Sequence, residues 1–110
     1  ELEAREETRV KADRTRSFSY AAARGRIDAM AARLSADGVV AGDRIAILSE
    51  NCIEYVELHM AAARIGAIVA CQNWRLTHAE LRHCVGLVAP RLLVHSRRFA
   101  DMAEALAAEF

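Results

Sequence analysis

The chain has 110 residues, of which 54% are hydrophobic and 27% are charged, so it can form a globular core and does not have the composition of a disordered segment. Its formal net charge of +0 gives no electrostatic reason to expect binding to nucleic acid or to an anionic membrane. Its apolar runs are far shorter than the roughly 20 residues of a membrane-spanning helix, and we expect no such span.

The three cysteines, Cys52, Cys71 and Cys84, are odd in number and have no paired spacing. This pattern is typical of reduced intracellular thiols, and the polar N-terminus does not resemble a signal peptide. We therefore expect a cytoplasmic protein. Abundant alanine, with Lys11 as the only lysine, fits a GC-rich bacterial genome, and a start at Glu1 suggests a piece of a longer chain.

The N-terminal third predicts a hairpin followed by a helix. Residues 1–7 are mostly charged, and we expect them to form a solvated lead-in. Short strands at 8–11 and 17–20 flank the turn-prone residues 13–16, which is a hairpin pattern. A helix over 21–36 is indicated because apolar residues recur at i, i+3, i+4 and i+7. These residues are Ile27, Met30, Ala31 and Leu34.

Three strand–helix units follow. Residues 45–48 form an apolar run without alternation, which is typical of a strand buried on both faces of a parallel sheet. Asn51 can cap the next helix, with Glu54 completing a capping box, and Gly66 ends that helix. Residues 67–71 predict a second buried strand.

The loop 72–76 leads to the next helix. Thr77 is predicted to cap that helix, with Glu80 as its capping-box partner. Residues 92–94 predict a third buried strand. Ser96 can cap a last helix, which has one apolar face.

The order of elements predicts an α/β fold: a small parallel sheet in βαβαβα order with an N-terminal hairpin. Strands that alternate with helices pair in parallel through right-handed crossovers. Parallel strands that are buried on both faces need helices on both sides, and three short strands form only a small sheet. We therefore interpret residues 8–110 as the first α/β subdomain of a larger N-terminal domain in which more sheet follows.

No phosphate-binding or metal-binding motif is visible. The five glycines lack the spacing of a nucleotide-binding loop. There is no C-x-x-C pair, and His78 and His83, at i and i+5, are separated on a helix. We predict no metal site and interpret the four histidines as half-exposed imidazoles. They are His59, His78, His83 and His95.

Two pairs of side chains resemble catalytic groups but have simpler explanations. His83 and Cys84 are adjacent, so they point in different directions on a helix, and Cys84 lies on the apolar face, where a thiol is inert. Glu54 and Glu57 fit a solvated helix stripe, with Glu54 also used for capping. No catalytic, cofactor-binding or metal-binding residue is therefore assigned.

Trp74 is the residue that the sequence singles out. It lies in a loop after a parallel strand, where ligands bind in open α/β sheets. Alternatively, it packs over the sheet edge or anchors the rest of a longer protein. Arg97 and Arg98 could contact phosphate, but cations are disfavoured in the first turn of a helix, so we expect a surface role.

Several segments together resemble the adenylate-forming enzymes, and their acyl-CoA synthetase branch in particular. They follow the family's order: FSY at 18–20, GVVAGDRIAIL at 38–48, AAARIGAIV at 61–69, NWRLTHAEL at 73–81 and PRLLV at 90–94. Asn51 and Glu54 match the family's Asn-x-x-Glu. Trp74 stands where many members have proline, and Ala22 where many have glutamate.

The resemblance implies an AMP-forming ligase. A carboxylic acid would attack the α-phosphate of ATP in the presence of magnesium, and the thiol of CoA would then displace AMP from the acyl-adenylate. The family's catalytic motifs match nothing in residues 1–110, so we expect the chain alone to be inactive and to bind no cofactor. Its expected partners are the remainder of the parent chain and a carboxylic acid substrate, and it is expected to self-associate.

Two other interpretations stay open. A stand-alone flavodoxin-like binding or interaction domain would be monomeric, would unfold cooperatively and would bind a ligand at its strand ends. A split or regulatory subunit of a ligase would have a separately encoded partner and a large apolar interface.

Overall fold

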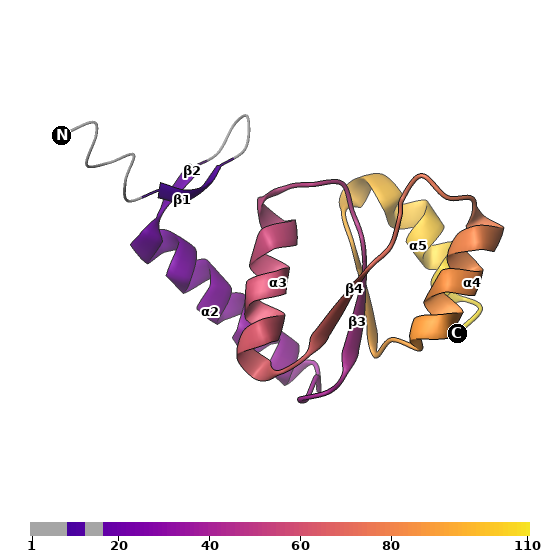
Figure 1. Cartoon of the computed structure of the whole chain (residues 1–110), viewed down its shortest axis with the longest axis horizontal. Coiled ribbons are helices and arrows are strands. Elements are labelled where there is room, and N and C mark those ends of the chain that lie inside the picture. The colour runs from indigo at the N-terminus through magenta and orange to yellow at the C-terminus, as the bar shows by residue number, and fades with distance from the viewer. Residues whose placement is uncertain (1–8, 13–16) are drawn as a thin grey trace.

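A computed structural model describes residues 9–12 and 17–110 and shows an α/β fold in three layers (Figure 1). The predicted lead-in at 1–7 and the hairpin turn at 13–16 lie outside the described residues. The strands are β1 (Arg9–Ala12), β2 (Ser17–Ser19), β3 (Arg44–Leu48), β4 (Ile68–Cys71) and β5 (Leu92–His95). The helices are α2 (Tyr20–Ala36), α3 (Ile53–Ile65), α4 (His78–Val88), the 3-10 turn η1 (Arg97–Phe99) and α5 (Ala100–Ala107).

The hairpin and the first helix agree with their predictions. β1 and β2 pair antiparallel, with Lys11 opposite Phe18. α2 begins at Tyr20, one residue earlier than predicted. The Ser19 hydroxyl sets this start, because it accepts the backbone N–H of Ala22 at 3.2 Å and so caps the helix.

β3 is the central strand of the parallel sheet, with β4 on one side and β5 on the other. Ile45 of β3 lies opposite Val69 of β4 and Leu92 of β5. Residues 45–48 are buried, as predicted for a strand that is covered on both faces. The prediction that β4 and β5 are equally buried is wrong, because both are edge strands whose residues are half-buried or exposed.

The two faces of the sheet carry separate hydrophobic cores. α2 and α3 cover one face, and α4 and α5 cover the other (Figure 1). The buried residues of the first core are Ile27, Ala31, Leu34, Val39, Ile45, Ile47, Leu58, Ala61 and Ala62. Those of the second core are Leu48, Leu81, Val85 and Leu106. Adjacent residues of a strand point to opposite faces, which explains why Ile47 and Leu48 belong to different cores.

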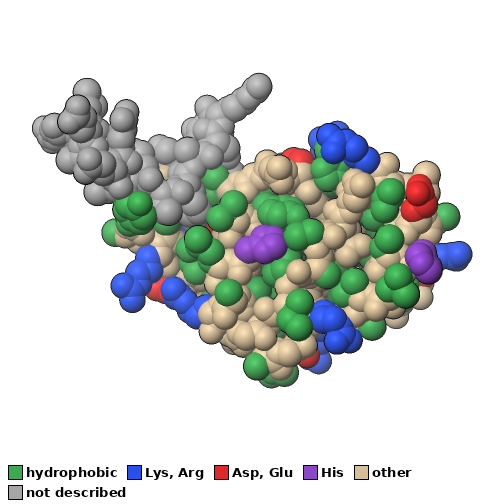
Figure 2. Space-filling model, viewed as in Figure 1, with side chains coloured by type: hydrophobic (Ala, Val, Ile, Leu, Met, Phe, Trp, Pro, Cys, Tyr) green, Lys and Arg blue, Asp and Glu red, His purple; other side chains and the backbone are tan. Residues whose placement is uncertain are grey.

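Hydrophobic side chains are exposed along α3 and β4. Val56 and Met60 lie one turn apart on α3, and Ile68, the first residue of β4, is 53% exposed. Figure 2 shows hydrophobic side chains over much of the visible face. In the described part of the chain β4 has one neighbouring strand, so its other edge presents backbone groups for pairing. No described helix combines the length and the apolar character needed to cross a membrane.

The end of α3 and the start of α4 follow the predicted capping chemistry. Gly66 ends α3 with φ of 78°, a left-handed conformation that glycine adopts without steric cost. At the start of α4 the Thr77 hydroxyl accepts the backbone N–H of Glu80 at 3.3 Å, and the Glu80 carboxylate accepts the Thr77 N–H at 3.0 Å. The predicted capping box is therefore confirmed.

The capping box predicted for Asn51 and Glu54 is wrong. α3 begins at Ile53, and its N-cap is Cys52, whose side chain makes no capping hydrogen bond. The helix starts one residue later than the predicted box requires, so Asn51 precedes the N-cap and Glu54 is the second helical residue instead of the third. The Glu54 carboxylate accepts a hydrogen bond from the Arg26 guanidinium of α2 at 3.4 Å instead.

Candidate functional site

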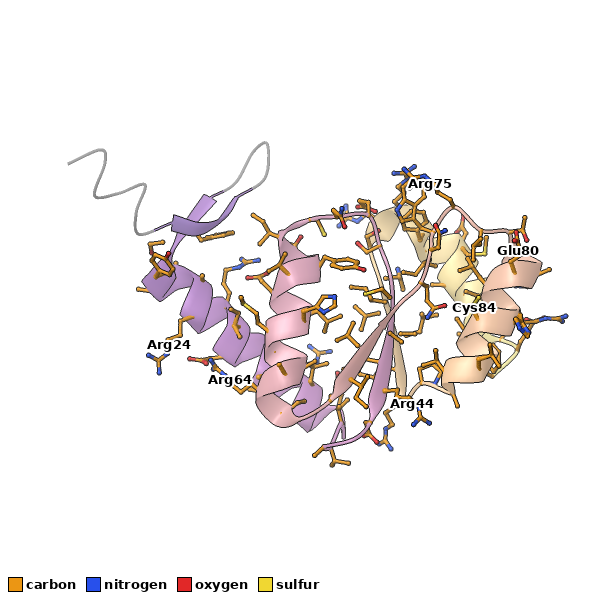
Figure 3. The ribbon with its side chains drawn as sticks, in the orientation of Figure 1. Arg24, Arg44, Arg64, Arg75, Glu80 and Cys84 are labelled. Atoms are coloured by element: carbon orange, nitrogen blue, oxygen red, sulfur yellow. The ribbon has the colours of Figure 1, made fainter. Side chains whose placement is uncertain are left out.

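Three loops follow the carboxyl ends of the parallel strands. They are residues 49–52 after β3, 72–77 after β4 and 96–99 after β5. Carboxyl ends of parallel strands lie at one edge of a sheet, which is where ligands bind in open α/β folds. Figure 3 shows Arg75 at this edge and Arg44 at the opposite one.

Four side chains from two of these loops form an arginine–tryptophan cluster, defined as Trp74, Arg75, Arg98 and Phe99. The guanidinium carbons of Arg75 and Arg98 lie 4.4 Å and 4.5 Å from the centroid of the Trp74 ring. Arg98 also lies 5.2 Å from the Phe99 ring, and the two aromatic rings are 5.5 Å apart. Cation–π contacts at exposed sites contribute about 0.5–1 kcal/mol each.

Local structure holds the cluster in place. Trp74 is half-buried and packs against the second core, which fixes its ring. The backbone N–H of Arg75 donates to the Asn73 side-chain oxygen at 3.0 Å, an Asx-type contact that shapes the loop. η1 then places Arg98 and Phe99 against the same ring.

The cluster carries positive charge at the ligand edge. Arg75 and Arg98 are exposed, and the ion pairs of the described residues involve neither of them. A guanidinium whose face stacks on an aromatic ring keeps its in-plane N–H donors for other partners. Carboxylate and phosphate match that planar donor geometry, so the cluster can bind an anionic group.

Trp74 packs on the second core, as one of the two interpretations expects, and its ring also supports two arginines at the carboxyl edge of the sheet. Its role in ligand binding stays a prediction. Arg97 and Arg98 are exposed, as expected for surface residues, but Arg98 also stacks on two aromatic rings. Arg75 was not predicted as a site residue from the sequence. The available signal was a Trp–Arg pair after one strand and an Arg–Arg–Phe run after another.

A cavity of about 350 Å³ lies at the same edge, between the ends of β3 and β5. Its polar lining residues include Ser49, Glu50, Cys52, His95, Ser96 and Arg97. The Ser96 hydroxyl donates to the Glu50 carboxylate at 2.8 Å. The prediction that Ser96 caps the last helix is wrong, because its hydroxyl is used by Glu50 and the chain enters α5 through η1.

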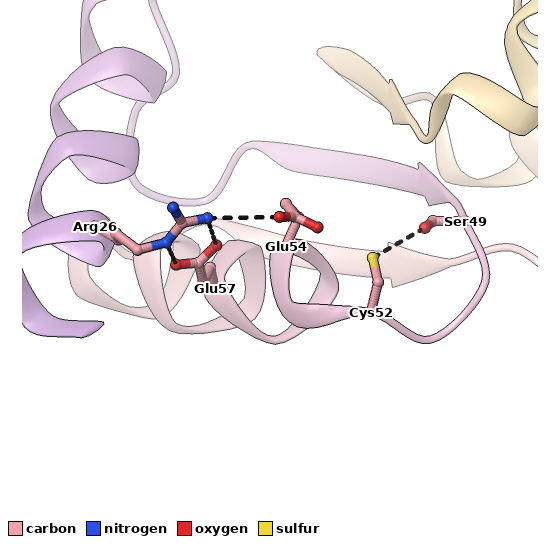
Figure 4. A network of polar contacts seen from close by, with 5 residues as sticks. All are labelled: Arg26, Ser49, Cys52, Glu54 and Glu57. Carbon is pink, nitrogen blue, oxygen red and sulfur yellow. Dashed lines mark hydrogen bonds and ion pairs between the residues drawn. The ribbon is translucent and has the colours of Figure 1, made fainter. Parts of the chain in front are cut away.

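The prediction that Glu54 and Glu57 form a solvated stripe is wrong for Glu57, which is 1% exposed. The two Glu57 carboxylate oxygens accept hydrogen bonds from Arg26 at 2.5 Å and 3.0 Å (Figure 4). The Arg26 guanidinium also lies 4.4 Å from the centroid of the Phe18 ring. These contacts connect the hairpin, α2 and α3, so the carboxylates have a structural role.

The described residues contain no group of three or more His, Cys, Asp or Glu side chains placed to hold a metal ion. Within the described part of the chain, a cysteine–histidine pair is present that the sequence did not predict. The Cys71 sulfur at the end of β4 lies 3.4 Å from Nε2 of His59 on α3. Sequence spacing gives no signal for this pair, because the contact depends on how α3 packs beside β4.

The described residues thus form an open α/β unit, with a parallel sheet, helices on both of its faces and a basic carboxyl edge. Residues 2–109 match the family described as AMP-binding enzyme. The chain belongs to this family, which confirms the resemblance drawn from its sequence.

Two relatives illustrate the similarity. An acyl-CoA ligase of Ajellomyces capsulatus is 45% identical over 64 residues, which cover 58% of this chain and 11% of the relative. A feruloyl-CoA synthase of Amycolatopsis sp is 35% identical over 92 residues, which cover 84% of this chain and 19% of the relative. The chain therefore spans less than a fifth of the length of either protein.

Solved structures agree with the predicted fold class. The N-terminal domain of FACL13 from Mycobacterium tuberculosis superposes with a TM-score of 0.79 at 27% identity, over 84% of this chain and 23% of that domain's chain. ATP-bound MatB from Rhodopseudomonas palustris gives a TM-score of 0.77 at 30% identity, over 86% and 19% of the two chains. The chain has the fold of part of the N-terminal domain of acyl-CoA ligases.

Proposed function

We propose that the chain is the N-terminal structural part of an ATP-dependent, AMP-forming acid–thiol ligase. Such an enzyme joins a carboxylic acid to CoA through an acyl-adenylate and releases AMP and pyrophosphate, with ATP and magnesium as cofactors. Family membership carries this proposal. It is supported by relatives that are named acyl-CoA ligase and feruloyl-CoA synthase, and by a related structure that holds ATP.

We place the parent enzyme in the bacterial cytoplasm and in fatty acid metabolism. The three cysteines are free, which supports a reducing compartment. The use of alanine and arginine supports a bacterial source. The likeness to FACL13 and to acyl-CoA ligases supports an acid of the acyl class as substrate.

The 110 residues alone are proposed to be inactive. They contain no glycine-rich phosphate loop, and their only lysine, Lys11, lies in the N-terminal hairpin. Their role is to supply the β4-β3-β5 sheet and the basic edge described above. The remainder of the parent chain is the expected partner of the open sheet edges.

Within the parent enzyme we assign the arginine–tryptophan cluster to a phosphate-bearing substrate. Two exposed guanidinium groups flank one indole at the ligand edge of the sheet. Phosphate carries more negative charge than a carboxylate and accepts bidentate hydrogen bonds from arginine. ATP and CoA both carry such groups, so either substrate would satisfy the cluster.

The coding sequence beyond Phe110 tests the proposed function. We expect it to continue into a Ser/Thr/Gly-rich loop with a lysine, followed by an aromatic-x-x-Thr-Glu motif. A stop codon after Phe110, with no partner gene that carries those motifs, would overturn the ligase assignment and favour a stand-alone binding domain.

A further inference from the structure

A cluster of thiol, imidazole and phenol side chains lies where the end of β4 packs beside α3. The Cys71 sulfur is 3.4 Å from Nε2 of His59. Tyr55 and His59 are one turn apart on α3, and their ring centroids are 5.2 Å apart. Cys71 and His59 are both exposed, so a small reagent can reach the sulfur.

The chemistry of the cluster favours attack by the sulfur. Burial raises the pKa of Tyr55 to about 12, with smaller contributions from hydrogen bonding to Cys71 and from the charge of that sulfur. The phenol therefore stays protonated at neutral pH and can donate a hydrogen bond to the sulfur. The imidazole nitrogen of His59 is positioned to accept the thiol proton, as in cysteine–histidine nucleophiles.

The other two cysteines lack this arrangement. Cys52 is half-buried, and its sulfur lies 3.7 Å from the Ser49 hydroxyl. Cys84 is half-buried on α4. Neither sulfur makes a hydrogen bond to a histidine in the described part of the chain. The alkylation rates of Cys52 and Cys84 therefore serve as internal references for thiols that have no neighbouring base.

We propose that Cys71 is a reactive thiol that is modified by soft carbon electrophiles, with His59 as the positioning base. In the reaction with iodoacetamide the Cys71 sulfur forms a bond to carbon while the carbon–iodine bond breaks. Iodide leaves, and the thiol proton passes to Nε2 of His59. The described titratable groups that contact Cys71 are Tyr55 and His59, both on α3; its strand neighbour on β3 is the apolar Ile47. The proposal applies to the chain with the β4 edge uncovered, and it requires no ligase activity.

Limited alkylation of the 110-residue chain with iodoacetamide, followed by peptide mass spectrometry, gives a rate for each cysteine. We expect Cys71 to react faster than Cys52 and Cys84 by on the order of tenfold or more. In urea the three rates should become similar, because the cluster is lost. Equal rates for the three cysteines in the native chain would overturn the proposal.

A His59→Ala variant separates base assistance from simple exposure. We expect its Cys71 rate to fall by on the order of tenfold, while the rates of Cys52 and Cys84 stay unchanged and so report an intact fold. Free imidazole should restore part of the lost rate. His95→Ala is the matched control, because His95 is exposed and bonded to the Ser96 carbonyl, and it should leave the Cys71 rate unchanged. A Cys71 rate unaffected by His59→Ala would refute the role of the imidazole.

Discussion

Trp74 is the only tryptophan of the chain, so its fluorescence reports directly on the arginine–tryptophan cluster. We predict that pyrophosphate changes this fluorescence at low salt, because the anion would bind the guanidinium groups stacked on the indole. A hydrogen bond to a charged group contributes about 1.5–3 kcal/mol, so replacing either Arg75 or Arg98 with alanine should weaken binding by roughly tenfold or more.

The matched control for this titration is Arg82→Ala. Arg82 is also exposed, but it lies on α4 and pairs with Glu109 at 3.5 Å, away from the indole. We expect this variant to bind pyrophosphate like the unmodified chain. An Arg75→Ala, Arg98→Ala double variant that binds equally well would contradict the proposed role of the cluster.

Glu57 shows how one buried charge connects two helices. Glu57→Ala would remove the two hydrogen bonds to Arg26 and leave a cavity in the α2–α3 interface. Breaking a buried ion pair costs about 3–5 kcal/mol, and we expect a smaller loss of about 2–3 kcal/mol because Arg26 is 39% exposed and can regain hydration. Urea unfolding measures this loss.

Arg33→Ala is the control for Glu57→Ala, because it breaks an exposed ion pair between Arg33 and Asp37 at the C-terminal end of α2. Surface pairs contribute about 0–1 kcal/mol, so we expect a change in unfolding free energy of less than about 1 kcal/mol. If Glu57→Ala cost no more than Arg33→Ala, the buried pair would not be a principal link between α2 and α3.

At the scale of single elements, the start of α4 offers a test of capping. Thr77→Ala should lower the free energy of unfolding by about 1 kcal/mol, because the Glu80 N–H loses its acceptor. Ser35→Ala on the exposed surface of α2 is the control, and we expect it to be neutral or slightly stabilising. Equal losses in the two variants would contradict the capping role of Thr77.

The same cap predicts a dependence on pH. Hydrogen bonds from the Thr77 backbone and, second, its side chain lower the pKa of Glu80 below 4.5. A group with a lowered pKa in the folded state stabilises above its unfolded pKa, and this contribution is lost as the pH falls through the folded value. The difference between Thr77→Ala and the unmodified chain should therefore be larger at neutral pH than in acid, as measured by urea unfolding.

Local sequence patterns predict where the helices and strands lie better than they predict which side chains pack together. The apolar run at 45–48 and the Thr77–Glu80 spacing are sufficient signals, because each depends on neighbours in the sequence. The cap at Asn51 fails because α3 starts at Ile53 with Cys52 as its N-cap, and Glu54 pairs with Arg26, which is distant in sequence. The Cys71–His59 contact has no local signal at all, since it arises from packing between α3 and β4.

The candidate site was only partly predictable for the same reason. Trp74 stands out as an aromatic residue after a parallel strand, and that position at the ligand edge follows from strand order. Arg98 reaches the same ring from a loop that follows a different strand. Sequence proximity cannot show that two loops share one aromatic ring, so the cluster becomes visible only in the folded chain.

At the scale of the whole molecule, β4 and β5 are open edges and apolar side chains lie beside one of them. We predict that the isolated chain self-associates or binds an apolar dye, because open edges and exposed apolar surface favour pairing. Ile68→Lys should reduce the association seen by sedimentation, whereas Ser35→Lys on α2 should not. A clean monomer that binds no dye would support the stand-alone domain instead.

The central claim is that this chain is part of an acid-activating ligase. ATP–pyrophosphate exchange tests it most directly, using the full-length protein that contains residues 1–110 and a panel of carboxylic acids. We predict exchange that depends on an acid and on magnesium, with none from the 110-residue chain alone. An intact, folded full-length protein that supports no exchange with any acid, and forms no acyl-CoA from them, would contradict the account.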